Sequence, residues 1–285
     1  MDTLEVIDLY LCAPVLYSKI VTGGSSGIGK AIAHELARRG ADIFLIARRE
    51  DPLKAALAEI QQDVGKPFQR FGFFCADVSD PASLKEAVRI AEGACGPPAI
   101  LVNSAGISNP GYLDKLPLSS MEEEIRVNYF GTVYMVKQVL SGMIGRRQGW
   151  ILNVSSLAGL KGLFGYAGYC GSKFAVVGFS EALRSEVRPY NVKVSVLCPP
   201  DVDTPMLRRE NALKPPETLK IAETGKVMKA VDVAQAAIQG MERGSFLIIP
   251  NLSGKILSFV NSIAPNLLDW YLNRTVDLVR RERKF

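Results

Sequence analysis

Tyr169 and Lys173 are the two residues of this sequence whose types and spacing best fit acid–base chemistry. They stand four positions apart on a predicted helix, so their side chains share one face. A free tyrosine has a pKa of about 10, and a nearby ammonium group lowers that pKa because it stabilises the phenolate. Ser156 follows a predicted strand, where its hydroxyl could hold a carbonyl oxygen. The three residues predict proton transfer to or from a substrate oxygen during hydride transfer.

A glycine-rich loop gives this prediction its weight, because a Tyr-x-x-x-Lys spacing alone is common on helix surfaces. The loop follows the first predicted strand and opens a helix at Ile28. Gly23 permits a tight turn, Gly27 lets the backbone approach a phosphate, and Gly29 allows close packing. The helix N-terminus adds unpaired N–H groups and a dipole that favours anions. This order favours a dinucleotide pyrophosphate site over an ordinary turn. The expected contacts are Thr22, Gly23, Ser25, Ser26, Gly27, Ile28 and Gly29.

The end of the second predicted strand indicates which dinucleotide is bound. A carboxylate there would bind the ribose 2′-hydroxyl of NAD, but this sequence has Arg48 and Arg49 after Ala47. A guanidinium group suits a 2′-phosphate, so Arg48 predicts NADP(H), with Ser25 as a possible helper. The alternative is that both arginines are solvated charges that open the next helix.

The elements that must position these residues alternate between short apolar runs and amphipathic stretches. Predicted strands cover residues 18–22, 43–47, 71–76, 100–103, 151–154, 192–197 and 246–249. Predicted helices cover residues 28–39, 53–64, 83–94, 121–144 and 172–187. Apolar strands separated by helices predict an α/β fold with a doubly wound parallel sheet, a Rossmann fold, whose ligands bind at the carboxyl ends of the strands. The Pro-rich and charged residues 199–229 predict a mobile segment over the site.

Length and composition support one globular domain of 285 residues, with a core over about 18–250 and a helical extension over 251–285. The net charge of +5 is modest and its basic residues are scattered, so nucleic-acid binding is not expected. Five cysteines without paired spacing favour neither disulfides nor zinc, and no metal site is predicted. Acidic residues near the N-terminus argue against a secretory signal, and the apolar run 9–17 is too short to span a bilayer.

Taken together, these motifs make the chain similar to the classical subfamily of short-chain dehydrogenases/reductases over about residues 18–250. Further matching positions are Asp77 and Val78 after the third strand, Asn103, Ala105 and Gly106 after the fourth, and Asn128 on the following helix. The resemblance implies that Tyr169 exchanges a proton with the substrate oxygen while Ser156 orients it. It also implies that Lys173 binds the nicotinamide ribose and that Asn128 holds a water in a proton relay. The family requires no metal and is usually oligomeric.

The segment after the sixth strand narrows the substrate. The family's Pro-Gly is replaced by Pro199-Pro200, and the family pattern places Val202 and Thr204 at the nicotinamide carboxamide. Residues 188–215 are similar to the branch of the family that reduces sphingoid ketones with NADPH. This implies a long-chain lipid substrate in sphingolipid synthesis and an enzyme at the cytosolic face of a membrane, the endoplasmic reticulum in a eukaryote. Another lipophilic substrate (steroid, retinoid or 3-oxoacyl) or a non-catalytic NADP(H)-binding regulator remains open.

The C-terminal extension carries apolar residues followed by a basic end. Such a helix can lie in a lipid interface or cover an apolar tunnel. Packing on its own core or on a partner subunit is the alternative.

Overall fold

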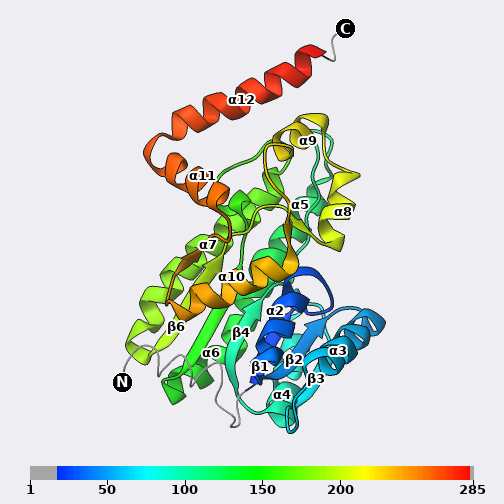
Figure 1. Ribbon diagram of the computed structural model, residues 1–285, viewed down its shortest axis with the longest axis vertical. Coiled ribbons are helices and arrows are strands. Elements are labelled where there is room, and N and C mark those ends of the chain that lie inside the picture. The colour runs from blue at the N-terminus through cyan, green and yellow to red at the C-terminus, as the bar shows by residue number, and fades with distance from the viewer. Residues whose placement is uncertain (1–17, 283–285) are drawn as a thin grey trace.

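A computed structural model describes residues 18–282 and contains a seven-stranded parallel sheet (Figure 1). Its order is β3-β2-β1-β4-β5-β6-β9. The strands are β1 (Ser18–Thr22), β2 (Asp42–Ala47), β3 (Phe71–Cys75), β4 (Pro98–Asn103), β5 (Gly149–Val154), β6 (Val192–Leu197) and β9 (Leu247–Ile248). Each predicted strand is present, and this order confirms the expected doubly wound α/β fold. The N-terminal run 9–17, Cys12 and the last three residues lie outside the described part of the chain.

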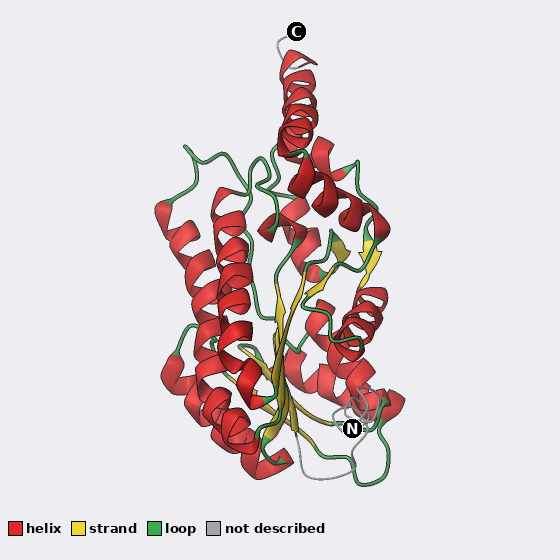
Figure 2. Ribbon diagram, turned by 90° about the vertical axis from the view of Figure 1, so that its left-hand side faces the viewer, coloured by secondary structure: helices red, strands yellow, loops and turns green. Residues whose placement is uncertain are grey.

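Helices cover both faces of the sheet, which Figure 2 shows nearly edge-on. One face packs against α2 (Gly27–Arg38), α3 (Glu50–Val64) and α10 (Ala230–Glu242). The other packs against α4 (Pro81–Cys95), α6 (Gly131–Arg146) and α7 (Ala167–Val187). Successive strand residues alternate between the two cores: Val21 packs with Leu36 of α2, whereas Ile20 packs with Met135 of α6. Burial on both faces explains why the strands read as continuous apolar runs.

The chain changes direction across the sheet at β1, which pairs with β2 on one side and β4 on the other. The helices that follow β1 and β4 leave on opposite faces, so a crevice opens above the carboxyl ends of these two strands. The glycine loop after β1 therefore lies at the point where this fold binds ligands.

The predicted helix over 121–144 is present as one continuous helical segment that contains a π-helical turn. Helix α5 (Leu118–Glu124) passes into a π-helical turn (Ile125–Phe130) before α6 begins. Asn128 lies in this turn and is 1% exposed. The wider turn points its side chain inward, where it bonds to residues outside the helix.

The segment over 199–229 folds into small elements above the sheet. Strands β7 (Val202–Asp203) and β8 (Met228–Lys229) pair in parallel, and α8 (Pro205–Asn211) and α9 (Pro216–Ala222) lie between them in sequence. Caps and strand pairing give this region secondary structure, and it lies over the cleft as predicted; its mobility stays a prediction.

The C-terminal extension forms α11 (Leu252–Ile263) and α12 (Pro265–Glu282), and α12 projects beyond the rest of the body (Figures 1 and 2). An ion pair between Lys161 and Asp269 at 2.5 Å and one between Arg280 and Glu217 at 3.4 Å attach α12 to the domain. Within residues 18–282, no helix is long and apolar enough to cross a bilayer.

Candidate active site

A cleft of about 300 Å³ lies at the carboxyl ends of the strands and holds the glycine loop at one end and Tyr169 at the other. Most of the predicted site residues line it: Gly23, Ser25, Ser26, Gly27, Ile28, Arg48, Asp77, Val78, Ala105, Gly106, Ser156, Tyr169, Lys173, Pro199, Val202 and Thr204. Thr22, Gly29, Asn103 and Asn128 stand behind the wall instead. The structure thus brings together residues from seven separate stretches of the sequence.

The glycine loop has the backbone shape that its glycines were expected to permit. Gly23 and Gly27 adopt φ angles of +66° and +57°. A Cβ atom on Gly23 would lie 2.8 Å from the backbone of Ser104, and one on Gly29 would lie 2.5 Å from the carbonyl oxygen of Gly23. No larger residue fits at either position without moving the main chain. The loop is therefore packed tightly against the residues that follow β4.

Two residues behind the wall support the loop through hydrogen bonds. Thr22 Oγ1 accepts bonds from the backbone N–H groups of Ser104 at 3.1 Å and Ala105 at 3.2 Å. Asn103 Nδ2 donates to Asn153 Oδ1 at 2.9 Å, and both residues are buried. Thr22 and Asn103 thus join the ends of β1, β4 and β5 and fix the floor of the cleft.

Arg48, which follows β2, and Asp77, which follows β3, also line the cleft. Their charged groups approach to 3.9 Å, and the Arg48 side chain is 56% exposed. Asp77 Oδ1 accepts bonds from the backbone N–H and hydroxyl of Ser79 at 2.8 and 2.7 Å. Asp77 is therefore held in place, and the exposed Arg48 guanidinium beside it can meet an anion at the mouth.

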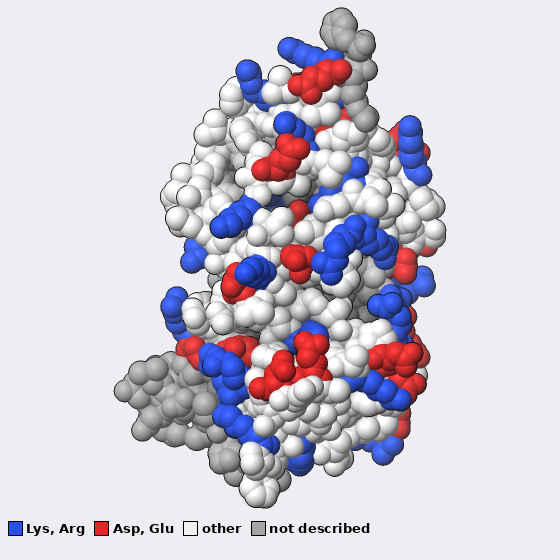
Figure 3. Space-filling model, turned by 45° about the vertical axis from the view of Figure 1, so that its right-hand side comes forward, with Lys and Arg blue, Asp and Glu red and all other residues white. Residues whose placement is uncertain are grey.

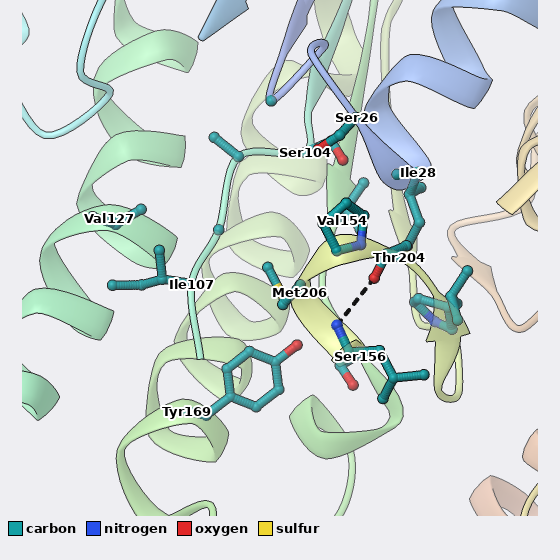
Figure 4. Close-up of a pocket in the computed structure, with 18 of the residues that line it drawn as sticks. Ser26, Ile28, Ser104, Ile107, Val127, Val154, Ser156, Tyr169, Thr204 and Met206 are labelled. Carbon is teal, nitrogen blue, oxygen red and sulfur yellow. Dashed lines mark hydrogen bonds between the residues drawn. The ribbon is translucent and has the colours of Figure 1, made fainter. Parts of the chain in front are cut away.

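Tyr169 lies in the first turn of α7, and its hydroxyl points into the cleft (Figure 4). Ser156 directly follows β5 and caps a short 3₁₀ turn, with its Oγ accepting a bond from the N–H of Ala158 at 3.1 Å. The Ser156 side chain lies close enough to Tyr169 to act on its phenol, whose pKa it lowers. The two hydroxyl groups together form a polar pair that can receive one carbonyl oxygen.

Lys173 lies one turn further along α7, with Nζ 5.6 Å from the centre of the Tyr169 ring. Nζ donates a bond to the carbonyl oxygen of Val154 at 2.9 Å. Burial lowers the pKa of Lys173 to about 8. Lys173 is the expected ammonium neighbour of Tyr169. With a pKa of about 8 it can release its proton near neutral pH.

The pKa of Tyr169 moves in the opposite direction to the one predicted from Lys173. Burial raises it most, and the Glu210 carboxylate raises it further, while the Ser156 side chain acts weakly against them. In this structure the desolvation of the phenol dominates its pKa. Tyr169 therefore holds its proton firmly, as a proton donor in the reductive direction must before a substrate arrives.

Asn128 positions the loop that follows β4. Its Oδ1 accepts a bond from the N–H of Ile107 at 2.8 Å, while Nδ2 donates to the carbonyl oxygen of Ile107 and to Ser172 Oγ, both at 2.9 Å. Gly106 lies between Asn128 and Lys173, since a Cβ there would stand 3.2 Å from Asn128 Oδ1 and 3.5 Å from Lys173 Nζ. Asn128 and Lys173 thus both lie next to Gly106, and the relay role of Asn128 stays a prediction.

The segment after β6 lines one side of the cleft. The carbonyl oxygen of Pro199 accepts a bond from the N–H of Leu157 at 3.0 Å. Val202 is buried in β7, and Thr204 caps α8 by accepting a bond from the N–H of Leu207 at 3.3 Å. The Thr204 methyl group faces Gly27, so the segment reaches across to the glycine loop.

Sequence reasoning missed two residues of this cleft, Tyr166 and Glu210. The Tyr166 hydroxyl donates a bond to Glu210 Oε2 at 2.9 Å, and both residues are buried. Tyr166 stands three positions before Tyr169 and could have been noticed from that spacing. Nothing in the sequence around Glu210 distinguishes it from a solvated residue of a short helix.

The comparisons with known proteins agree with this geometry. The family described as short chain dehydrogenase matches residues 19–214. The chain belongs to the short-chain dehydrogenase/reductase family, and it is an oxidoreductase that acts on a ketone or an alcohol.

Its relatives carry a more specific name. The chain is 41% identical to the 3-ketodihydrosphingosine reductase of Bos taurus over 263 residues, which cover 89% of this chain and 79% of the relative. It is 39% identical to the 3-dehydrosphinganine reductase of Danio rerio over the same shares of the two chains.

Solved structures show the same fold. A short-chain dehydrogenase from Sphingobium yanoikuyae in complex with NADPH has a TM-score of 0.74 and 26% identity, and the match covers 89% of this chain and 96% of that one. A short-chain dehydrogenase/reductase from Burkholderia phymatum in complex with NAD has a TM-score of 0.76 at 24% identity, covering 90% and 96%.

Proposed function

We propose that the chain reduces 3-oxosphinganine to sphinganine with NADPH, as a step of sphingolipid synthesis. The observation that carries the proposal is that Tyr169, Ser156 and the glycine loop all line the same cleft. A ketone held by the two hydroxyls would lie beside a dinucleotide held by the loop. The names of the relatives in Bos taurus and Danio rerio support the choice of substrate.

The residues present fit a dinucleotide. The glycine loop leaves no room for a Cβ at Gly23, and the N-terminus of α2 directs its N–H groups toward the cleft. Arg48 at the mouth suits the 2′-phosphate that distinguishes NADPH from NADH. The NADPH in the Sphingobium yanoikuyae structure supports this preference. When bound, the nicotinamide supplies the hydride that the carbonyl carbon receives.

The chain's own residues then handle the oxygen and the proton. Ser156 donates a hydrogen bond to the carbonyl oxygen and fixes its position. Tyr169 gives that oxygen its phenolic proton, which burial has kept on the residue at neutral pH. Lys173 has three donors and uses one on Val154, so the other two remain for the nicotinamide ribose and for a water next to Asn128 that returns the proton.

The C-terminal extension supports a lipid substrate. Its two helices expose a row of large apolar side chains, namely Leu252, Ile256, Phe259, Ile263, Leu267, Trp270, Tyr271 and Leu278. Single exposed apolar residues are ordinary, but a row over two amphipathic helices favours contact with a membrane surface. We therefore extend the proposal to peripheral binding at the cytosolic face of a membrane, where a long-chain ketone is available. Self-association, common in the family, forms part of the same proposal.

The test is an assay of the purified chain with NADPH and 3-oxosphinganine. We expect loss of NADPH absorbance and formation of sphinganine, identified by mass spectrometry. A steroid ketone, a retinal and a 3-oxoacyl thioester, each tested in parallel, should be reduced with lower kcat/KM. Reduction of one of these in preference to 3-oxosphinganine would replace the proposed substrate, and no reduction of any would contradict the enzymatic role.

A further inference from the structure

Glu210 is a buried carboxylate in the wall of the cleft that the reaction above does not use. It lies on α8, is 6% exposed, and lines the same cavity as Tyr169. Its Oε2 accepts the hydrogen bond from Tyr166, whose ring centre lies 5.7 Å from that of Tyr169. The carboxylate therefore stands close to the point where a substrate oxygen would be protonated.

Within the described part of the chain no cation contacts this carboxylate, and the charge of Lys214 acts on it only from beyond contact distance. Among residues 18–282, no Lys, Arg or His nitrogen lies within 4.0 Å of the Glu210 oxygens. The neighbouring Lys214 pairs with Asp201 at 3.1 Å, and Lys173 donates to Val154. The buried hydroxyl of Ser108 also faces Glu210, but it completes no hydrogen bond of normal geometry. The two carboxylate oxygens of Glu210 are thus buried with one hydrogen-bond donor, the Tyr166 hydroxyl.

An unpaired carboxylate is costly to bury, and the site shows that cost in two places. Burial raises the pKa of Glu210 above its usual range. The negative charge of Glu210 in turn raises the pKa of Tyr169, as the second largest cause after burial. A cation bound against Glu210 would relieve both effects, because it stabilises the carboxylate and cancels its field at the phenol.

We propose that Glu210 binds an ammonium group standing on the carbon next to the substrate ketone, and that the cleft thereby selects α-amino ketones. The inference rests on the proposed function, because 3-oxosphinganine carries an amino group at that position. The ammonium donates to Glu210 while the carbonyl oxygen meets Ser156 and Tyr169. Attachment at two adjacent carbons fixes which face of the ketone is presented to the hydride.

The same contact couples recognition to proton donation. With an amino ketone in place, the positive charge offsets Glu210, and Tyr169 becomes a stronger acid. A ketone without the amino group leaves the charge of Glu210 unopposed, so Tyr169 remains the weaker acid. Selection therefore acts on kcat as well as on KM.

The experiment compares 3-oxosphinganine with its deamino analogue, in which hydrogen replaces the amino group. For the wild-type chain we expect kcat/KM to be higher with the amino ketone by roughly 10- to 100-fold, the range of a charge-assisted hydrogen bond. Glu210→Gln should bring this ratio close to one, mainly by a loss with the amino ketone. Glu210→Asp, which retains the charge, should keep part of the preference.

Glu217→Gln is the matched control, since Glu217 is also buried and also accepts a tyrosine hydroxyl, from Tyr112 at 2.9 Å, but lies outside the cleft. It should keep the wild-type ratio. An unchanged ratio in a folded Glu210→Gln chain would overturn the inference while leaving the proposed function intact. A wild-type ratio near one would overturn it without any variant. Failure of the wild-type chain to reduce 3-oxosphinganine at all would overturn the proposed function and this inference together.

Discussion

Lys173 Nζ and the carbonyl oxygen of Val154 are joined by a 2.9 Å hydrogen bond that ties α7 to the carboxyl end of β5. A second bond runs the other way, from Ser155 Oγ to the carbonyl oxygen of Lys173 at 2.9 Å. These links hold Tyr169, one turn earlier on α7, in fixed relation to Ser156 just beyond the strand. The lysine thus has a positioning role in addition to any contact with a cofactor.

Tyr169→Phe should reduce kcat by roughly 10²- to 10⁴-fold, the usual contribution of a general acid. The ring stays, so packing and NADPH binding should be preserved, as measured by fluorescence titration of the cofactor. Tyr190→Phe, at an exposed position outside the cleft, is the control and should keep full activity. Substantial turnover by Tyr169→Phe would refute the assigned proton donor.

Arg48→Asp should reverse the choice of cofactor. The variant removes a cation from the mouth of the cleft and places a second carboxylate near Asp77. We expect the ratio of kcat/KM for NADPH over NADH to fall by roughly 10- to 100-fold. Arg243→Asp makes the same charge change on α10's exposed end and should leave the ratio unaltered. Equal losses with both cofactors would show that Arg48 does not read the phosphate.

Gly29→Ala should destabilise the protein and weaken cofactor binding, because its Cβ would lie 2.5 Å from a backbone oxygen. The expected loss is about 1–3 kcal/mol of unfolding free energy, measured by urea denaturation. Gly93→Ala is the matched control on α4, where a Cβ would meet nothing within 4 Å. It should stabilise the protein by up to about 1 kcal/mol. Similar effects of the two substitutions would contradict the close approach at Gly29.

Glu124→Gln should change how stability depends on pH. Burial raises the pKa of Glu124 to about 7, although its Oε1 accepts a bond from the N–H of Asn109 at 2.7 Å. The folded protein then binds more protons at this site than the unfolded chain between pH 4.5 and 7. Stability contributed by the protonated form is therefore lost as pH rises through about 7.

For this variant we expect a higher Tm than wild type at pH 8 and little difference at pH 5, as measured by calorimetry. The amide oxygen of glutamine can still accept the bond from Asn109. A Tm difference that is the same at both pH values would contradict ionisation of Glu124 as the cause.

Phe259→Asp with Trp270→Asp should weaken binding to anionic phospholipid vesicles, as measured by flotation. The two side chains are 63% and 58% exposed on α11 and α12. Phe68→Asp, at a fully exposed phenylalanine elsewhere on the domain, is the matched control and should float like wild type. Figure 3 shows basic and acidic side chains interspersed on the face it presents, so charge alone offers no comparable docking surface there. Unchanged flotation of the double variant would contradict the membrane role of these helices.

The sheet and the cofactor loop could be predicted from sequence because their signals are local. The strands Ser18–Thr22 and Val192–Leu197 match prediction at both ends, since each apolar run is bounded by polar or turn residues. Gly23 was predicted from the tight turn that it makes, and its φ angle of +66° confirms that reasoning. Local pattern and tertiary structure agree at these positions.

What could not be predicted depends on partners distant in sequence. Asn128 lies in the π-helical turn and bonds to Ile107, 21 positions away. Glu210 accepts its hydrogen bond from Tyr166, 44 positions away, and the pKa of Tyr169 is raised by burial and then by the charge of Glu210. A Tyr-x-x-x-Lys pattern predicts that two groups are near each other, but the dielectric around them is a property of the assembled cleft.

The π-helical turn at Ile125–Phe130 also sets the rotational phase of the helix that follows it. It uses one residue more than an α-helical turn would, so each residue from Gly131 onward is rotated by about 100° from where an uninterrupted helix would carry it. The buried faces of α5 and α6 therefore point in different directions around one continuous helical axis. Deleting one residue within the turn would restore α-helical phase. Either the packing of α6 on the sheet or the hydrogen bonds of Asn128 to Ile107 would then be lost.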